Sequence, residues 1–408
     1  MGKIRTYLVM VLFACLSLSS CNEEGINVDE VNKETVFVYM PWTGSETSSG
    51  LYECLLINLD SIEAAIQRNG LKDTRVLVFL SESHEQSKLY EITYDQKAGL
   101  EHKAIKQYSG HEYTTADGIA SILTDVKNAA YALNYGLIIG AHGTGWTHVS
   151  DWEDFPYKAP KKYNGQRKTP GMELLQYPET RFFGSSTDKR FSTDIEVLAE
   201  GIRKSGLHMQ YILFDDCYMA NVEVAYELRN QTNFLLGSTS EVIDLGIPYA
   251  DMWSSLATPT PNYSSTVSAF YNFYKDYSTP CGTFAAIDCR QVESLASIMR
   301  QINQNFTFDE TMLDDVQVLD GFEVPIFFDI EDYVHHLCTD PYLYERFAAQ
   351  LEKTVVSKAA TEFIYSHIYS IPEIIDVNTF SGMTISDPSQ NVAAMRGKSN
   401  TSWWKATH

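Results

Sequence analysis

The sequence predicts an α/β protein, a three-layer α/β/α sandwich with a mostly parallel sheet, plus a smaller C-terminal α+β region. Two observations lead to this prediction. Over residues 35–305, short apolar runs typical of buried parallel strands alternate with segments of helical periodicity. After residue 305 the alternation loosens into helices followed by short strands. We therefore expect one large domain over 35–305 and a smaller subdomain over 306–408 that packs on it.

The first residues have the pattern of a targeting signal. Two basic residues precede an apolar stretch, 7–18, that is too short for a comfortable membrane span. The stretch ends in Leu-Ser-Ser-Cys at Cys21, which resembles a bacterial lipobox. The resemblance implies a signal peptide over 1–20, a lipid on Cys21, and an envelope protein anchored to the outer membrane, with surface exposure as a further hypothesis. Residues 21–34 are then an acidic linker; an ordinary secretory signal cut near Ser20 is the alternative.

The elements of the large domain follow from local patterns. Strands are expected where β-branched, aromatic or other apolar residues run together, and the alternating run 89–94 is expected in a hairpin. Helices are expected where apolar residues recur three and four positions apart. The clearest helix covers 115–133, with Thr115 as its N-cap and Leu133 at the end of its apolar stripe. The expected strands are 35–40, 75–80, 89–94, 135–141, 211–214, 234–238 and 282–288. The expected helices are 58–68, 115–133, 194–204, 220–228, 264–277 and 292–303, followed in the C-terminal region by helices at 329–337 and 342–357 and strands at 363–369 and 380–385.

A cysteine stands at the end of one of these strands. Asp215, Asp216 and Cys217 follow the buried run 211–214 directly and precede a helix. Open α/β sheets bind ligands at the carboxyl ends of their strands, and a helix N-terminus favours a thiolate. A lone cysteine in this place is most often a small core residue, so a chemical role for Cys217 requires a partner.

A histidine stands at the end of another strand. The run 135–141 leads directly into His142 and Gly143. Two buried strands that deliver a cysteine and a histidine at their ends are typical of a thiol hydrolase. The glycine allows close approach of the backbone to a substrate, and its N–H can point at a developing oxyanion. The sequence contains no Gly-x-Ser-x-Gly elbow, which argues against a serine hydrolase.

Both strand ends resemble the signatures of the clostripain-like cysteine peptidases, which belong to the caspase, legumain and gingipain clan. The resemblance rests on His142-Gly143-Thr144-Gly145-Trp146, on Asp215-Asp216-Cys217-Tyr218-Met219-Ala220 with the helix after it, and on 183–188, 237–241 and 248–249. It implies a caspase-like fold and peptide hydrolysis by a dyad, with Cys217 as nucleophile and His142 as its proton partner. The backbone N–H groups of Gly143 and Cys217 would form the oxyanion hole. The alternative is a peptidase-fold envelope lipoprotein that binds peptides or proteins without turnover.

The resemblance also bears on specificity. It places the carboxylate two residues before the nucleophile, here Asp215, in the S1 pocket, where an acid would select Arg or Lys at P1. The alternative is that Asp215 caps the following helix, but we expect Asp216 to be that cap. Glu241 and Asp244 lie where relatives supply a second pocket acid, and their spacing does not choose between them.

Composition and local motifs limit the partners, cofactors and modifications that we expect for this chain. The net charge of −22 argues against nucleic acid, so peptides or proteins are the expected substrates. No cofactor is expected: some family members require calcium, but the acidic cluster 151–154 lacks the oxygen spacing of a Ca²⁺ loop. The stretch 147–180 is basic and aperiodic, and the resemblance to clostripain-like peptidases makes it a candidate for self-cleavage; an intact solvated loop is the alternative. The sequence does not decide whether Cys281 and Cys289, which flank a predicted strand, form a disulfide.

Overall fold

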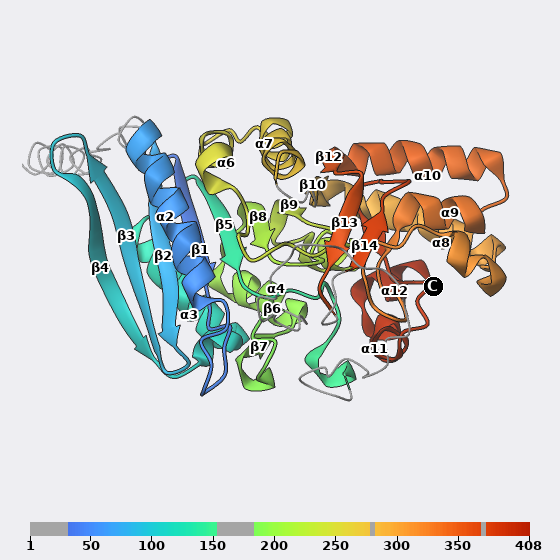
Figure 1. Cartoon of the computed structure of the whole chain (residues 1–408), viewed down its shortest axis with the longest axis horizontal. Coiled ribbons are helices and arrows are strands. Elements are labelled where there is room, and N and C mark those ends of the chain that lie inside the picture. The colour runs from blue at the N-terminus through green and yellow to red at the C-terminus, as the bar shows by residue number, and fades with distance from the viewer. Residues whose placement is uncertain (1–31, 153–182, 278–281, 369–372) are drawn as a thin grey trace, which may run out of the picture.

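The computed structural model describes residues 32–152, 183–277, 282–368 and 373–408 (Figure 1). The strands of the main sheet are β1 (Glu34–Met40), β2 (Thr74–Ser83), β3 (Gln86–Asp95), β4 (Gly99–Ser109), β5 (Asn134–Gly140), β8 (Met209–Asp215), β9 (Thr232–Gly237), β10 (Thr283–Asp288) and β12 (Val355–Ala360). Within the described residues these nine strands form one sheet in the order β12-β10-β9-β8-β5-β1-β2-β3-β4. The central strands from β9 to β2 are parallel, and antiparallel strands extend the sheet at both edges.

Helices cover both faces of this sheet, which confirms the predicted three-layer α/β/α sandwich. The helices are α2 (Tyr52–Asn69), α3 (Ala116–Ala129), α4 (Ile195–Ser205), α5 (Val222–Leu228), α6 (Tyr249–Leu256), α7 (Tyr263–Lys275), α8 (Val292–Asn305), α9 (Ile330–Leu337), α10 (Pro341–Thr354), α11 (Val392–Gly397) and α12 (Ser402–Thr407). Strand β1 shows how the two cores arise, because its side chains alternate between the faces. Phe37 and Tyr39 join the core beneath α3, α4, α5 and α8. Val36, Val38 and Met40 join the core beneath α2, α6 and α7.

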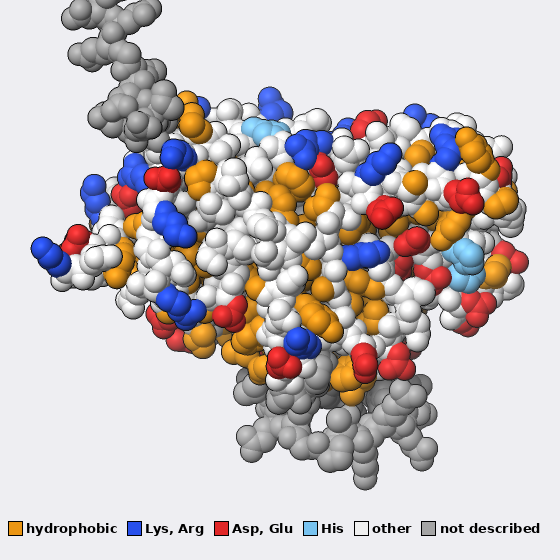
Figure 2. All heavy atoms as spheres, turned by 90° about the horizontal axis from the view of Figure 1, so that it is seen from above, with side chains coloured by type: hydrophobic (Ala, Val, Ile, Leu, Met, Phe, Trp, Pro, Cys, Tyr) orange, Lys and Arg blue, Asp and Glu red, His pale blue; other side chains and the backbone are white. Residues whose placement is uncertain are grey.

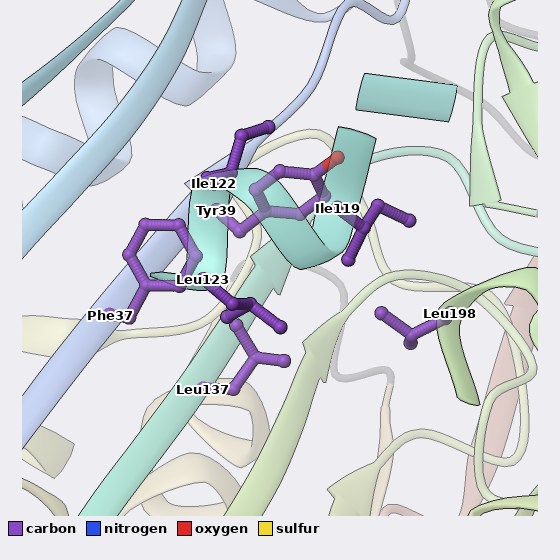
Figure 3. Close-up of a pocket in the computed structure, with 7 residues that line it drawn as sticks. All are labelled: Phe37, Tyr39, Ile119, Ile122, Leu123, Leu137 and Leu198. Atoms are coloured by element: carbon purple, nitrogen blue, oxygen red, sulfur yellow. The ribbon is translucent and has the colours of Figure 1, made fainter. Parts of the chain in front are cut away.

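The first of these cores contains a small apolar cavity between β1, β5, α3 and α4, where the side chains converge (Figure 3). The lining residues are Phe37, Tyr39, Ile119, Ile122, Leu123, Leu137 and Leu198. The one hydroxyl among them, on Tyr39, donates to the carbonyl of Tyr113 at 2.6 Å. The lining therefore offers no spare polar group that would hold a water or a polar ligand.

All strands and helices predicted over 35–305 are present, with shifted ends. The end of the 115–133 helix is a correction: α3 ends at Ala129, and Leu133 lies beyond it with 60% of its surface exposed. The helix predicted over 342–357 is also too long, because the β-branched pair Val355 and Val356 begins strand β12. Strand β4 and helix α6 are additional elements. The side chains of β4 are mostly exposed, so that strand lacks an apolar signature.

The C-terminal region contributes to the main sheet as well as packing on it. Strand β12 pairs antiparallel with β10 and forms one edge of the sheet, although it lies beyond residue 305. The remaining C-terminal strands form two small pairs, β13 (Phe363–Ser366) with β14 (Glu373–Asp376) and β11 (Phe328–Asp329) with β15 (Thr384–Ile385). In Figure 1 this region forms the end of the molecule opposite β4. The division into domains at 35–305 and 306–408 stays a prediction, although the pairing of β12 with β10 joins the two parts in one sheet.

Several sequence predictions lie outside the described residues. These are the signal peptide over 1–20, the lipid site Cys21, almost all of the acidic linker, most of the 147–180 stretch and Cys281 with its pairing to Cys289. Among the described helices, none combines the length and apolar character needed to cross a bilayer. Figure 2 shows Lys and Arg side chains interspersed with Asp and Glu over one face of the molecule.

Candidate active site

The register between β5 and β8 brings the predicted cysteine and histidine to the same edge of the sheet. The two strands are parallel neighbours, and Gly140 at the end of β5 pairs with Asp215 at the end of β8. His142 stands two residues after Gly140, and Cys217 stands two residues after Asp215. The two side chains therefore leave adjacent strands at the same level, at the carboxyl edge where α/β sheets place their sites.

The loops after these strands are in direct contact. A Cβ added to Gly143 would lie 2.6 Å from the carbonyl oxygen of Cys217 and 3.2 Å from its backbone nitrogen. Only a residue without a side chain fits such an approach without displacing the backbone. The N–H-bearing residues Gly143 and Cys217, predicted to form an oxyanion hole, thus lie side by side.

Asp216 connects the two strand ends and does not cap the following helix, which corrects the sequence prediction. Its Oδ1 accepts a hydrogen bond at 2.6 Å from the backbone N–H of Ala141, the residue that directly precedes His142. The N-cap of α5 is Asn221, whose side chain accepts from the N–H of Val224 at 2.8 Å. Burial raises the pKa of Asp216 well above its usual range.

His142 is buried and its backbone is held in place. Its N–H donates to the carbonyl of Gly184 at 3.3 Å and its carbonyl accepts from the N–H of Gly184 at 3.1 Å. The ring nitrogen Nε2 is buried and has no hydrogen-bond partner within the described residues. Burial lowers the pKa of the ring to about 3, so His142 is neutral at physiological pH and can accept a proton.

The Cys217 thiol lies against the segment after β9. Its Sγ accepts from the backbone N–H of Val242 at 3.3 Å and faces the carbonyl of the same residue at 3.6 Å. Burial, together with the nearby carboxylate of Glu241, raises the thiol pKa well above its usual range. In this arrangement the site holds a neutral thiol and a neutral imidazole.

Asp215 is buried beside the nucleophile and is held from two helices. Its Oδ2 accepts from the side-chain amide of Asn58 on α2 and from the hydroxyl of Tyr249 on α6, both at 2.9 Å. Gly246, with φ of +66°, packs against the same carboxylate. Burial raises the pKa of Asp215 to about 7, while the bond from Tyr249 opposes the rise. The carboxyl is therefore poised between its charged and neutral forms near neutral pH.

The two further acids differ in their surroundings. The carboxylate of Glu241 accepts from the hydroxyls of Tyr218 and Ser366 and from the backbone N–H of His367. Asp244 is exposed, and its charge is close enough to raise the pKa of Cys54 on α2, although burial is the larger cause. Asp244 stands two residues before Gly246, which packs against the Asp215 carboxylate.

Sequence reasoning missed the residues that support the site from a distance. Asn58 and Tyr249 hold Asp215, while Tyr218 holds Glu241. One signal was available for Asn58, because it interrupts the apolar stripe of α2 at a fully buried position. A buried polar side chain on an apolar face requires a hydrogen-bonding partner. The identity of that partner could not be read from the sequence.

The assembled groups are those of nucleophilic acyl chemistry. A thiol, a neutral imidazole and the backbone N–H groups of two adjacent loops stand at the same edge of the sheet, beside a buried carboxyl. No group of three or more His, Cys, Asp or Glu side chains suited to a metal ion occurs in the described part of the chain. In the acidic cluster 151–154, Asp151 is bound to His148 at 2.9 Å, and the last two residues lie outside the described ranges.

Comparisons with known proteins agree with this chemistry. A family model described as the clostripain family, peptidase family C11, matches residues 58–386. A solved structure of a secreted C11 cysteine protease from Bacteroides thetaiotaomicron, called iotapain, is 41% identical, covers 93% of this chain and 99% of its own, and has a TM-score of 0.81. A clostripain from the same organism, in complex with the peptide inhibitor BTN-VLTK-AOMK, is 47% identical over 56% of this chain and 99% of its own, with a TM-score of 0.54.

A more distant likeness shows the fold alone. An inactive zymogen C11 protease from Parabacteroides distasonis is 22% identical, covers 92% of this chain and 98% of its own, and has a TM-score of 0.74. No curated protein matches the chain.

Proposed function

Because the chain belongs to the clostripain family and is a cysteine peptidase of that family, we propose that it cleaves peptide bonds with a Cys217–His142 dyad and prefers Arg or Lys at P1. One observation carries the dyad. The parallel pairing of Gly140 with Asp215 supports it, because His142 and Cys217 each follow one of these paired residues by two positions. The alternative of a binding protein without turnover loses its support, since the family relatives are cysteine proteases.

The proposed reaction uses the groups in sequence. The Cys217 Sγ attacks the substrate carbonyl carbon while its proton passes to Nε2 of His142, which is unoccupied within the described residues. The carbonyl oxygen becomes an oxyanion and receives hydrogen bonds from the N–H groups of Gly143 and Cys217. The protonated His142 then gives its proton to the leaving amine as the C–N bond breaks. Water, deprotonated by His142, cleaves the resulting thioester and restores the thiol.

The preference for a basic P1 residue rests on Asp215. It is a buried carboxyl beside the nucleophile, and an ionised carboxylate in such a place pairs strongly with a guanidinium or ammonium group. We assign Asp244 as the second acid of this pocket, because it is exposed and stands two residues before Gly246, which packs against the Asp215 carboxylate. Glu241 is unsuited to that role, since three protein donors already occupy its carboxylate. The inhibitor bound to one relative, BTN-VLTK-AOMK, ends its peptide part with lysine, which supports the proposal.

The remaining parts of the proposal concern location and activation. We infer that residues 1–20 are a signal peptide and that Cys21 carries a lipid anchor in the cell envelope; the relative called iotapain is secreted, which supports export. Self-cleavage within 147–180 stays a candidate activation step. The proposed reaction requires no cofactor, and a calcium requirement is the alternative that assays with and without Ca²⁺ address.

The dyad is tested by comparing the wild type with Cys217→Ala and His142→Ala on peptide libraries varied at P1. We expect cleavage after Arg and Lys in the wild type, and a loss of kcat of about 10⁴-fold or more in each variant, since nucleophile and base act as a unit. Fragments on a denaturing gel in the wild type alone would indicate self-cleavage. Peptide cleavage by Cys217→Ala at the wild-type rate would refute the dyad.

A further inference from the structure

The residue directly after the nucleophile is held in an unfavourable backbone conformation. Tyr218 has φ of +62°, in the left-handed region, which a residue with a bulky side chain rarely adopts. Such a conformation persists only where surrounding contacts over-determine it, and it occurs most often at functional sites. The Cys217–Tyr218 peptide determines where the nucleophile and its N–H point, so whatever holds Tyr218 also sets the geometry of Cys217.

Several contacts hold Tyr218, and one of them is the hydrogen bond that its carbonyl accepts from the side-chain amide of Asn221 at 2.7 Å. The Tyr218 ring is fully buried and stacks on Phe327, with centroids 4.9 Å apart and an interplanar angle of 13°. Its backbone N–H donates to the carbonyl of Ser240 at 3.0 Å. Its hydroxyl donates to Oε1 of Glu241 at 2.7 Å. The ring position and the hydroxyl position together fix the side chain, and the side chain in turn fixes the backbone turn.

Glu241 links this turn to the C-terminal region. The hydroxyl of Ser366 donates to Oε1, and the backbone N–H of His367 donates to Oε2 at 2.8 Å. The next residue, Val242, is the one whose backbone contacts the Cys217 thiol. The Glu241 side chain thus holds the residue after the nucleophile, while its own main chain continues into the segment that touches the sulfur.

We propose that Glu241 is a positioning residue, which through Tyr218 and the end of β13 keeps the nucleophile turn in its reactive geometry. This inference rests on the proposed role of Cys217, and it replaces the expectation that Glu241 selects basic substrates. It also gives the C-terminal region a part in catalysis, because Ser366, His367 and Phe327 complete the support. The positioning role and the pocket role of Glu241 predict different results for the substitution Glu241→Gln.

The discriminating substitution is Glu241→Gln. A glutamine can place its carbonyl oxygen toward the His367 N–H and its amide N–H groups toward the two hydroxyls, which accept as well as donate. The geometry therefore survives the loss of charge. Glu241→Ala removes all three bonds. A pocket acid, by contrast, requires its charge, so glutamine would serve it no better than alanine.

The experiment measures kcat and KM of the full chain and its variants on matched peptides with Arg, Lys or Gln at P1. For Glu241→Ala we expect kcat to fall about 10-fold or more, because small misplacements of reacting groups cost up to about 10²-fold. KM and the ranking of P1 residues should stay unchanged. Glu241→Gln should recover kcat to within about 3-fold of the wild type, and Tyr218→Phe, which keeps the stacked ring, should lie between the two.

Two controls separate positioning from general stability. Asp340→Ala removes another carboxylate that binds backbone N–H groups in the C-terminal region, where it caps helix α10. It should lower the Tm without lowering kcat at temperatures where the protein is folded. Crystal structures give a readout independent of turnover: Tyr218 should keep its positive φ in Glu241→Gln and lose it in Glu241→Ala.

The results of these experiments can refute the positioning role of Glu241 separately from the proposed function. A wild type that cleaves no peptide would overturn the proposed function, while the φ of Tyr218 in the variants would still test the positioning role. Equal losses for glutamine and alanine, confined to Arg and Lys substrates, would show that Glu241 is a pocket acid. An unchanged kcat, or an unchanged Tyr218 conformation in Glu241→Ala, would also refute the inference.

Discussion

Replacing Asp215 by asparagine tests the origin of P1 specificity. The substitution keeps the shape of the side chain and retains an oxygen that accepts from Asn58 and Tyr249, which bind the wild-type carboxylate at 2.9 Å. It removes only the charge. If Asp215 pairs with the P1 side chain, substrates with Arg or Lys lose their partner, whereas substrates with a neutral P1 residue do not.

The size of the expected loss in kcat/KM follows from the burial of Asp215. Asp215 is 7% exposed, so a P1 cation bound beside it is largely removed from water. Leaving one member of a buried ion pair without its partner costs about 3–5 kcal/mol. At about 1.4 kcal/mol for each tenfold change, kcat/KM for Arg and Lys substrates should fall by between roughly 10²-fold and roughly 4 × 10³-fold. For substrates with a neutral P1 residue, kcat/KM should change by less than about 3-fold.

The pH profile gives a second signature. Burial raises the pKa of Asp215 to about 7, so the protonated, uncharged form gains population as the pH falls through 7. A neutral carboxyl cannot pair with a cation, and kcat/KM for Arg substrates should therefore drop about tenfold per unit below pH 7. Tyr249→Phe removes a bond that lowers this pKa and should shift the acid limb to higher pH.

The assay compares fluorogenic peptides that differ only at P1, with arginine or its uncharged analogue citrulline, between pH 5 and 9. The ratio of kcat/KM for the two peptides isolates the pocket from the chemical step. If Asp215→Asn keeps the wild-type ratio, or if its acid limb with the arginine peptide is unchanged, Asp215 does not supply the P1 charge and the pocket assignment is wrong.

Two further predictions concern the close approach at the site and the pH dependence of stability. In Gly143→Ala the new methyl group would lie 2.6 Å from the carbonyl oxygen of Cys217, so kcat should fall about 10²-fold or more as the oxyanion donors shift; Gly237→Ala, whose nearest contact would be an ordinary 3.5 Å, is the control and should keep its activity. His148 is bound by two carboxylates, and its hydrogen bond to Glu196 is the largest cause that raises its pKa from 6.5 to about 9. The folded-state pKa lies above the unfolded value, so this stabilisation is fully present below pH 6.5 and is lost as the pH rises through 9. Urea unfolding of His148→Gln should show a pH-dependent deficit of roughly 3 kcal/mol at pH 6 that disappears by pH 10, and a deficit equal at both values would contradict the assignment.

Local sequence patterns were sufficient to predict the order of the core elements and the two strand ends that carry Cys217 and His142. Both are local properties. A buried parallel strand is a short apolar run, a helix repeats its apolar residues every three to four positions, and each pattern is written within about ten residues. The polar side chains directly after such runs necessarily lie at the edge of the sheet. Strand β4 lacks this signature because its side chains are mostly exposed.

The contacts between distant groups, and the surroundings of each acid, became visible in the three-dimensional fold. The carboxylate of Asp215 meets Asn58 across 157 positions of sequence, and that of Glu241 meets His367 across 126. Glu241 and Asp244 are equivalent candidates by spacing, yet one is occupied by three donors and the other is exposed. Such pairings depend on sheet register and helix packing, which arise from the summed burial of two cores. No short pattern around either residue carries that information.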